Sequence, residues 1–302
     1  MKSLDLMLLY YDKPGILKNW LYRLAFKSDF LKFSNRIRII VTDTGTPWDK
    51  ISESLKLIQY LPDAVRKRVT YIRCETEEIR KRVPPEIDAR PMCHAKNVIA
   101  LDYSEADVIL TSMLGNVFSP DYFGGHIAKH LIDPKAVVLP KRFDLFSNSY
   151  HTEGYKAEWE EVLKGDIRPS GGWPDVSVRR HWLKEIGGWD ESYIAISPDD
   201  MDMGSRLTGK LDNEAPSEAL FTLKGHFNNL GLTLYQPYYP TFYSLTCNTY
   251  PGHVAKEDPR RQRGYEIGIQ HYLANWGVVK RNENRVPIKY DILDFERPEK
   301  YE

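Results

Sequence analysis

The sequence contains few cysteines, and the three present are scattered. Cys74, Cys93 and Cys247 lie far apart in the chain, without the close spacing of a zinc site. Their odd number and wide separation also give no disulfide framework of the kind that small secreted domains use. We therefore expect a protein of a reducing compartment and place it in the cytoplasm.

Long apolar runs and an excess of charge of either sign are also missing. No run approaches the ~18 apolar residues that a membrane helix needs. The short apolar stretch at the N-terminus contains Asp5 and is followed by Asp12 and Pro14, which indicates a buried strand and not a signal peptide. Lysine plus arginine equals aspartate plus glutamate at 42 each, whereas proteins that coat nucleic acid show a basic excess. We expect no transmembrane segment, and this balance disfavours a nucleic-acid partner without excluding a local basic patch.

Aromatic residues, in contrast, are abundant. The 302 residues include 19 tyrosines and 7 tryptophans, and such side chains suit grooves that hold rings or sugars. The length fits one large α/β domain with additions, or two small domains.

Strand-like apolar runs alternate with helical periodicity over the first 140 residues. This alternation predicts an α/β fold with a mainly parallel central sheet flanked by helices. Ligands of such sheets bind beyond the C-terminal ends of the strands, so the turns at 11–15, 43–47 and 111–116 should converge on one site. The expected strands are 4–11, 36–42, 69–73, 107–110 and 136–139, and the expected helices are 14–27, 51–60, 95–103 and 120–131.

The pattern changes after Pro140. We predict a domain over 1–240, with one half over about 1–140 and another over about 141–240. An extension over 241–302, without strong periodicity, is expected to pack on the same domain. Within the second half we expect a helical insertion at 150–165, a loop at 169–174, helices at 181–186, 199–207 and 217–230, and a strand at 232–235.

Four segments in this order resemble the GT-A-fold glycosyltransferases, and among them the inverting family 2. The segments are LLYYDKPG, IIVTDTGT, CHAKNVIALDYSEADVIL and GGWPDVSVRRHWLKEIGGWDESYIAISPDDMDMGSRL. The resemblance covers about residues 4–240 and is most specific where GGWDE is followed by DDMDMGSRL. It implies an enzyme that transfers a sugar from a nucleotide-sugar donor to a hydroxyl of a glycan or other acceptor, with inversion. It also implies that the half over about 1–140 binds the nucleotide and that the half over about 141–240 is the acceptor side.

The acidic cluster PDDMDM is the candidate catalytic centre. Inverting transfer needs a carboxylate that takes the proton of the acceptor hydroxyl, and the resemblance places this base at Asp200, between Asp199 and Asp202. Clustered carboxylates also raise one another's pKa. The alternative is that the three acids only cap a helix and pair with Arg206. The preceding GGWDE favours catalysis.

The resemblance places donor contacts at the strand ends. Tyr10 and Tyr11 close the first strand, and Asp43 closes the second, where the family contacts the nucleotide base. Asp43 is also a residue type that shapes turns through its own side chain, and both roles are compatible.

Further along, three polar residues lie in or after the loop PPEIDARPMCHAKN. Arg90, Lys96 and Asn97 lie near an expected helix start, where a cation can hold a diphosphate. The alternative is that these residues belong to a solvated charged loop, and this alternative has more weight for Arg90 than for Lys96.

The turn TSMLGN lacks a feature that the family has. Family members carry Asp-x-Asp before a phrase like VFSPD, and these carboxylates hold Mg²⁺ or Mn²⁺ on the donor diphosphate. Counting back places the pair at Met113 and Gly115, whose side chains cannot bind a hard cation. Three explanations stay open: lysine or arginine replaces the metal, other residues such as Asp200, Asp202 or His253 hold it, or the chain binds a ligand without catalysis. The retained acids at 199–202 weigh against the third.

The acceptor side is represented by Trp173 and Asp175 in SGGWPD. The tryptophan either stacks on a sugar face, with the carboxylate binding a hydroxyl, or is a core residue that holds the loop in place. We expect His253 to be structural. The side chains of Arg260, Arg261 and Arg263 either cover the diphosphate or face solvent, and we favour solvent. A silent sugar-nucleotide or glycan-binding protein and a nucleotidyltransferase are the rival functions.

Overall fold

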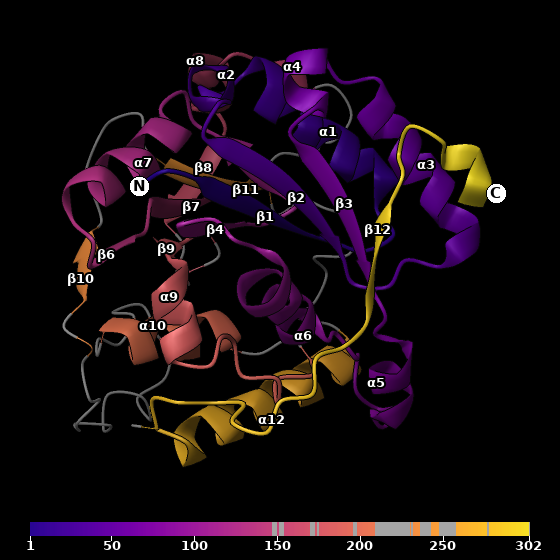
Figure 1. Ribbon diagram of the computed structural model, residues 1–302, viewed down its shortest axis with the longest axis vertical. Helices are drawn as coiled ribbons and strands as arrows, with labels where there is room; N and C mark the ends of the chain where they lie inside the picture. The colour runs from indigo at the N-terminus through magenta and orange to yellow at the C-terminus, as the bar shows by residue number, and fades with distance from the viewer. Residues whose placement is uncertain are drawn as a thin grey trace.

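A sheet of eight strands runs through the centre of the protein in the computed structural model (Figure 1). Its order is β10-β6-β9-β4-β1-β2-β3-β12. The structure describes residues 1–146, 150, 154–169, 173, 175–195, 198–208, 230, 232–235, 243–247, 258–276 and 278–301. The strands are β1 (Leu4–Tyr10), β2 (Ile37–Asp43), β3 (Val69–Cys74), β4 (Val108–Ser112), β6 (Ala136–Val138), β9 (Ser177–Arg179), β10 (Thr233–Tyr235) and β12 (Tyr290–Leu293).

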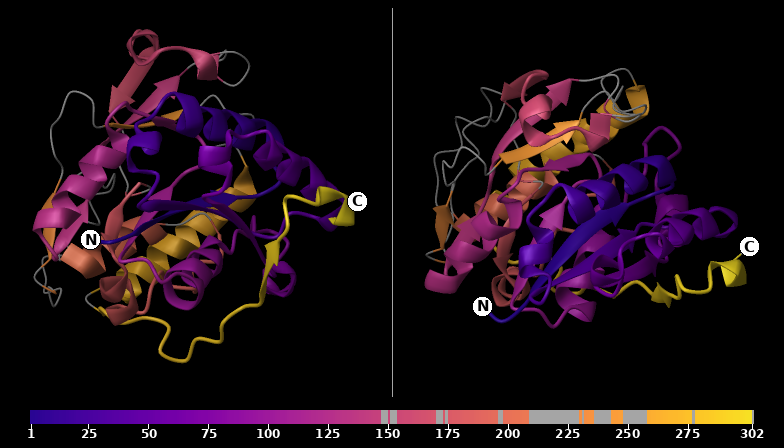
Figure 2. Two further views of the ribbon diagram at one scale, coloured as in Figure 1. Left: turned by 45° about the horizontal axis from the view of Figure 1, so that its top comes forward. Right: turned by 90° about the horizontal axis from the view of Figure 1, so that it is seen from above.

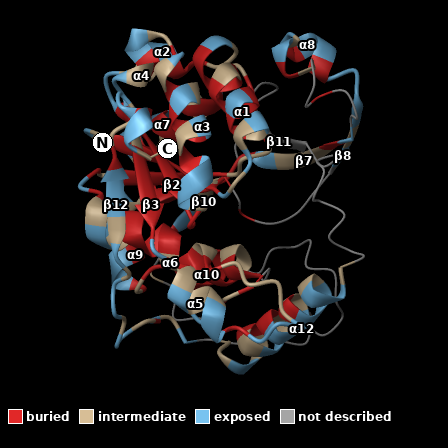
Figure 3. Cartoon of the chain, turned by 90° about the vertical axis from the view of Figure 1, so that its right-hand side faces the viewer, coloured by how far each residue is buried: buried red, intermediate tan, exposed pale blue. Residues whose placement is uncertain are grey.

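The centre of this sheet is parallel, as the sequence predicts. β4, β1, β2 and β3 pair in parallel, while β9 and β12 run antiparallel to their neighbours. Parallel strands covered on both faces are near-continuous apolar runs, and β1 and β2 are buried along almost their whole length. The fold is therefore of the mixed α/β class, with a mainly parallel central sheet. The strands β2 and β3 are coloured mainly as buried in Figure 3.

Helices cover both faces of the sheet because successive side chains of a strand point to opposite faces. Leu6 and Leu8 of β1 belong to one core with α1 (Pro14–Phe26), α3 (Trp48–Gln59) and α7 (Tyr122–Ile132). Met7 belongs to the opposite core with α6 (Met92–Asn97), the π-helix Val98–Tyr103, α9 (Arg180–Glu185) and α10 (Asp199–Thr208). The shorter helices are α2 (Phe30–Phe33), α4 (Asp63–Arg66) and α5 (Glu77–Arg82).

A second sheet of four strands lies beside the first (Figure 2). It has the order β5-β11-β7-β8 and packs with the short helical segments Gly154–Lys156 and α8 (Trp159–Val162) around Leu145, Tyr155 and Trp159. The predicted helical insertion at 150–165 is confirmed in part, because its described residues form these two short helical segments with turns around them. None of these strands was predicted: β5 (Asn116–Phe118), β7 (Lys141–Phe146), β8 (Asp166–Pro169) and β11 (Tyr243–Cys247).

The C-terminal part also has more regular structure than its sequence indicates. α12 (Pro259–Ala274) packs beside α10, and β12 adds an antiparallel edge strand to β3 (Figure 1). Two of the buried positions of α12 are Gly264 and Gly268, so its inward face carries no apolar stripe that a periodicity search would find. The 3₁₀ helix Pro298–Tyr301 follows β12. The helix expected at 217–230 lies almost entirely outside the described residues.

Candidate functional site

A cavity of about 320 Å³ opens at the C-terminal ends of β1 and β2. Lys13, Thr44 and Leu114 of its wall come from the three turns that follow β1, β2 and β4. These turns were predicted to converge, and they do. The full lining is Leu9, Tyr10, Tyr11, Lys13, Thr44, Arg80, Asp88, Ala89, Arg90, Met92, Leu114 and Arg261.

The turn after β1 is held against the turn after β2. Asp12 has a left-handed backbone, with φ of 39°, and its N–H donates to the Thr46 hydroxyl at 2.9 Å. The Tyr10 carbonyl accepts from the N–H of Thr44 at 2.9 Å. The Tyr10 hydroxyl bonds Ser54, and burial raises its pKa. The next ring, Tyr11, remains 41% exposed at the cavity.

Asp43 shapes the second turn from a fully buried position. One carboxylate oxygen accepts from the N–H groups of Gly45 and Thr46 at 3.1 and 2.8 Å, and also from the Thr46 hydroxyl. The other oxygen accepts from the Tyr71 hydroxyl at 2.7 Å. This is the turn-forming role. The expectation of a direct contact with a nucleotide base is not met by this geometry, because the side chain has no exposed surface.

Arginines from three different segments reach the cavity. The guanidinium of Arg80, on α5, lies 4.6 Å from the Tyr11 ring centroid and donates to the carbonyls of Thr44 and Ala89. Arg90 and Arg261, on the loop before α6 and on α12, each donate through Nε to Asp88, at 2.8 and 3.0 Å.

The wall of the cavity is therefore basic. Four basic side chains, Lys13 and the three arginines, face one carboxylate, Asp88. Burial by itself would raise the pKa of Asp88, but Arg90 and Arg261 outweigh burial and lower it.

The cavity brings together part of the predicted donor set, whose contact with a donor stays a prediction. Tyr10, Tyr11 and Arg90 line it together, as predicted. Arg261 was expected in solvent, which was wrong, whereas the side chains of Arg260 and Arg263 are 55% and 61% exposed as expected.

Sequence reasoning missed the remaining polar lining, which is Lys13, Arg80 and Asp88. Lys13 lies in the turn of the segment LLYYDKPG. Its place directly after the first strand was a signal that could have identified it. Arg80 and Asp88 lie in a highly charged stretch, where the sequence gives no signal that distinguishes them from their neighbours.

Asp199 and Asp200 begin α10 and face different partners. Asp199 forms a buried ion pair with Lys96, whose ammonium also lies 5.4 Å from the Trp189 ring centroid. Half-buried Asp200 accepts from the N–H groups of Trp173 and Met201, both at 2.8 Å. Burial, and then the negative charge of Asp199, raise the pKa of Asp200.

Lys96 and Asn97 are structural in this geometry and not part of the cavity wall. Lys96 is committed to Asp199. The buried side-chain amide of Asn97 donates to the Trp189 carbonyl at 2.7 Å and accepts from the Trp189 N–H at 2.8 Å. The expectation that both residues meet the donor is therefore not met, because their polar atoms are buried against the protein.

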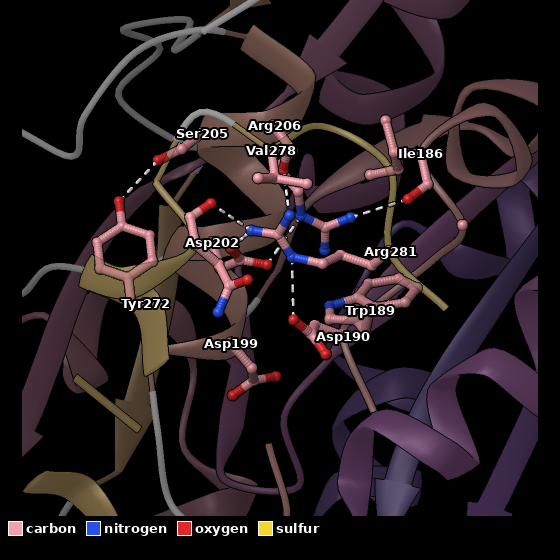
Figure 4. Close-up of polar contacts among 12 residues, drawn as sticks. Ile186, Trp189, Asp190, Asp199, Asp202, Ser205, Arg206, Tyr272, Val278 and Arg281 are labelled. Carbon is pink, nitrogen blue, oxygen red and sulfur yellow. Dashed lines mark hydrogen bonds and ion pairs between the residues drawn. The ribbon is translucent and has the colours of Figure 1, made fainter. Parts of the chain in front are cut away.

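Asp202 belongs to a buried ion-pair network (Figure 4). Its carboxylate pairs with Arg206 at 2.8 Å and with Arg281 at 3.4 Å, and Arg281 also pairs with Asp190 at 3.0 Å. Because Asp202 is only 1% exposed, the geometry favours the pairing with Arg206 over the predicted catalytic role. Asp199 lies apart from this network in the same view.

The GGWDE motif is explained by the same packing. Gly187 and Gly188 have φ of 75° and 73° after α9, a region that favours glycine. A Cβ on Gly187 would overlap the Arg281 carbonyl, and one on Gly188 would overlap the Asn97 amide. The motif thus joins α6, α9 and the C-terminal segment.

The predicted acceptor residues are buried. Trp173 is 3% exposed and covers Gly204 on α10, where a Cβ would lie 2.6 Å from the indole ring. Asp175 is fully buried and accepts from Asn116 and Tyr122 at 2.9 and 3.1 Å. The expectation of an exposed ring and carboxylate was wrong, and the core alternative holds for Trp173. His253 lies outside the described residues.

Two helices place the cavity next to the acids. Met92 and Lys96 lie four residues apart on α6, and the first lines the cavity while the second pairs with Asp199. On α12, Arg261 lines the cavity and Tyr265 lies one turn further on, where burial and then the charge of Asp200 raise its pKa. Residues four apart on a helix have Cβ atoms about 5–6 Å apart, so α6 and α12 each link the cavity wall to the acidic cluster, although Asp200 is not itself a lining residue.

The described lining of the cavity does not offer the ligands of a hard divalent cation. Met113, Leu114 and Gly115 form the turn after β4, and Leu114 reaches the cavity wall. Asp88, the carboxylate of the described lining, is engaged by arginines. Among the described residues no group of three or more histidine, cysteine, aspartate or glutamate side chains is arranged to hold a metal, whereas Mg²⁺ and Mn²⁺ need several oxygen ligands.

Comparison with known proteins supplies the fold name. No family model and no curated protein matches the chain. Among solved structures, the mannosyltransferase PcManGT from Pyrobaculum calidifontis, in complex with GDP-Man and Mn²⁺, is similar with a TM-score of 0.52 and 14% identity over 90% of this chain. The chain has a GT-A fold. It spans 63% of that mannosyltransferase, which is less than two thirds of its length.

Lower-scoring structures include two further proteins. One is TarS of S. aureus, with a TM-score of 0.40 and 14% identity over 66% of this chain and 32% of that chain. The other is GalNAc-T7 with UDP, GalNAc and Mn²⁺, with a TM-score of 0.43 and 10% identity over 67% of this chain and 40% of that chain. In the part of this GT-A-fold chain that the structure describes, no helix has the length and apolar character needed to cross a membrane.

Proposed function

We propose that this GT-A-fold chain is a glycosyltransferase that moves a sugar from a nucleotide-sugar donor to an acceptor hydroxyl with inversion, as the family 2 enzymes do. The observation that carries the proposal is the position of Asp200. We place this carboxylate beside the basic cavity because Arg261 of the cavity wall and Tyr265, whose pKa the charge of Asp200 raises, lie one turn apart on α12. The cavity lies at the C-terminal ends of the parallel strands, which is where α/β sheets bind their ligands.

The donor occupies the cavity in this proposal. Its volume of about 320 Å³ lies within the range of small-molecule sites. The exposed ring of Tyr11 and the apolar atoms of Leu9 and Met92 provide a surface for the nucleoside. Lys13 and Arg90 provide positive charge for the diphosphate.

Asp200 acts as the general base. As the acceptor oxygen forms its bond to the anomeric carbon, the bond from that carbon to the diphosphate oxygen breaks, and the nucleoside diphosphate leaves with the electron pair. The acceptor proton passes to Asp200. A pKa raised by burial and by Asp199 brings the carboxyl nearer to neutral pH, where a general base is most effective.

We propose further that the basic wall, and not a metal, neutralises the leaving diphosphate. The support is the charge of the described residues: Met113 and Gly115 replace the expected acid pair, and the cavity presents Lys13, Arg80 and Arg90. Fixed positive groups directed at developing charge stabilise such transition states.

The test is a panel of nucleotide sugars, first in thermal shift and then in a nucleotide-release assay. A donor should raise the melting temperature, because it binds the folded state, and its slow hydrolysis should release nucleoside diphosphate without any acceptor. A folded protein that no member stabilises contradicts donor binding. Stabilisation without release, with water and with a panel of hydroxyl acceptors, favours a silent binding protein.

A further inference from the structure

Asp88 is a carboxylate surrounded by arginines at the edge of the cavity. Its oxygens lie 2.8 Å from Nε of Arg90, 3.0 Å from Nε of Arg261 and 3.7 Å from the guanidinium of Arg260. Arg261 is 173 residues away from Asp88 in the sequence. Asp88 therefore places its negative charge between the arginines of two distant segments.

The cluster is accessible from the cavity. Asp88, Arg90 and Arg261 all line it, and their side chains are 20%, 34% and 15% exposed. An incoming anion can thus reach the guanidinium groups without unfolding of either segment.

The C-terminal helix fixes the position of Arg261. Gly264 packs so closely on Ala195 that a Cβ would lie 2.6 Å from the alanine methyl, and Tyr272 bonds Ser205 of α10 at 3.1 Å. Because α12 is fixed at both points, Arg261 is presented to the cavity by a rigid element.

The chemistry favours exchange of one anion for another. A carboxylate brings a single negative charge to these arginines, whereas a diphosphate brings two or more and offers several oxygens. Guanidinium groups bind phosphate oxygens in a bidentate manner. A diphosphate therefore competes effectively with Asp88 for the same two groups.

We propose that Asp88 is a resident counter-anion that the donor diphosphate displaces, and that Arg261 of α12 and Arg90 then bind the diphosphate. This inference rests on the proposed function for the identity of the anion. It makes the C-terminal helix part of the donor site, and it makes Asp88 a residue that lowers diphosphate affinity in the parent protein.

The test is calorimetry in EDTA with UDP, GDP and inorganic pyrophosphate as probes. Arg261→Gln should weaken binding of the preferred diphosphate by about 10- to 150-fold, the effect of one charge-assisted hydrogen bond. Asp88→Asn should bind the same probe more tightly than the parent. Arg263→Gln, on the same helix but exposed and paired with Glu266, is the matched control and should bind as the parent does.

Thermal melts show whether each variant is folded. Arg261→Lys, which keeps the charge but loses the planar fork, provides a second variant and should bind with intermediate affinity. Parent affinity in both Arg261 variants, weaker binding by folded Asp88→Asn, or failure of the parent to bind any of the three probes at millimolar concentration would each overturn the inference.

The outcomes separate this inference from the proposed function. If no nucleotide sugar is turned over but the diphosphate affinities follow the expected order, the anion site stands and the transferase proposal fails. If a sugar is transferred and Arg261→Gln binds the diphosphate as the parent does, only the anion site fails.

Discussion

Asn97 and Trp189 are joined through both ends of one side-chain amide, which donates to the Trp189 carbonyl at 2.7 Å and accepts from its N–H at 2.8 Å. The two residues are 92 positions apart. The amide thus ties α6, which borders the cavity, to the loop that precedes the acidic cluster.

Asn97→Ala should therefore act on stability. Removing the amide takes the acceptor from the buried Trp189 N–H, while the Trp189 carbonyl keeps the bond from Asn282 at 2.6 Å. An unsatisfied buried group of this kind costs roughly 1–3 kcal/mol. Urea unfolding measures the loss, with exposed Asn35→Ala as the control. Parent stability combined with a loss of nucleotide affinity would restore the original expectation that Asn97 contacts the donor.

Asp200→Asn should retain donor affinity and lose transfer by roughly 10²-fold or more, the scale of general-base loss. The amide keeps the shape of the side chain but cannot take a proton. In the parent, activity should fall as pH drops through a pKa above that of ordinary aspartate, because burial and Asp199 raise it. A variant as active as the parent removes Asp200 from the mechanism.

Asp202→Asn is the matched comparison. Its carboxylate is buried between Arg206 and Arg281, and removal of one partner from a buried ion pair costs about 3–5 kcal/mol. We expect a lower unfolding free energy, and near-parent turnover per folded molecule at low temperature. A stable but inactive Asp202→Asn protein would return this residue to the catalytic set.

Donor binding should depend little on divalent cations. The turn at Met113 and Gly115 offers no carboxylate, and arginines surround the donor cavity. Titration of a nucleotide-sugar donor in EDTA, and again with excess Mn²⁺, should give the same affinity and turnover. A large gain with Mn²⁺ shows that the metal has other ligands and that arginines do not replace it.

The unfolding free energy should fall in mild acid because of two buried histidines. His126 and His130 both contact the Ser177 hydroxyl, at 2.8 and 2.9 Å. Burial lowers the pKa of His126 well below the usual value, and burial followed by the charge of Arg179 lowers that of His130 to about 4. The unfolded chain takes up these protons near pH 6.5. The contribution of the two neutral histidines to the unfolding free energy is therefore complete above about pH 6.5 and is lost as pH falls toward 4.

Urea unfolding between pH 7 and 4 checks this, with His130→Gln as the comparison. The variant should show a shallower decline than the parent. Asp29, whose pKa burial raises to about 6, acts in the opposite direction over part of this range, and it is common to both proteins. Parallel curves would show that His130 does not contribute.

Much of the sheet was predictable because its strands are covered on both faces. β1, β2, β3 and β4 are short apolar runs followed by turn residues, and such runs depend little on what packs against them. β12 and α12 could not be recognised in this way. Three of the four residues of β12 are at least partly exposed, and α12 is packed through glycines.

The site was harder to predict because the position of a residue in a motif does not tell in which direction its side chain points. Asp200 and Asp202 lie two residues apart at the start of one helix, yet Asp200 is half-buried near the cavity whereas Asp202 is enclosed by arginines. Lys96 and Arg90 are both cations near a helix start, and only Arg90 reaches the cavity. Arg261 could not be assigned because its partner, Asp88, is distant in sequence.

The pairing of β12 with β3 has a consequence for biosynthesis. Tyr290–Leu293 forms the antiparallel cover of β3, whereas the parallel core of the sheet is complete by Ser112 in β4. During translation, β3 therefore presents unpaired N–H and C=O groups until residue 293 has left the ribosome, and such an exposed edge is a template for association with other chains. A nascent chain stalled before β12 should be the species that needs chaperone protection most.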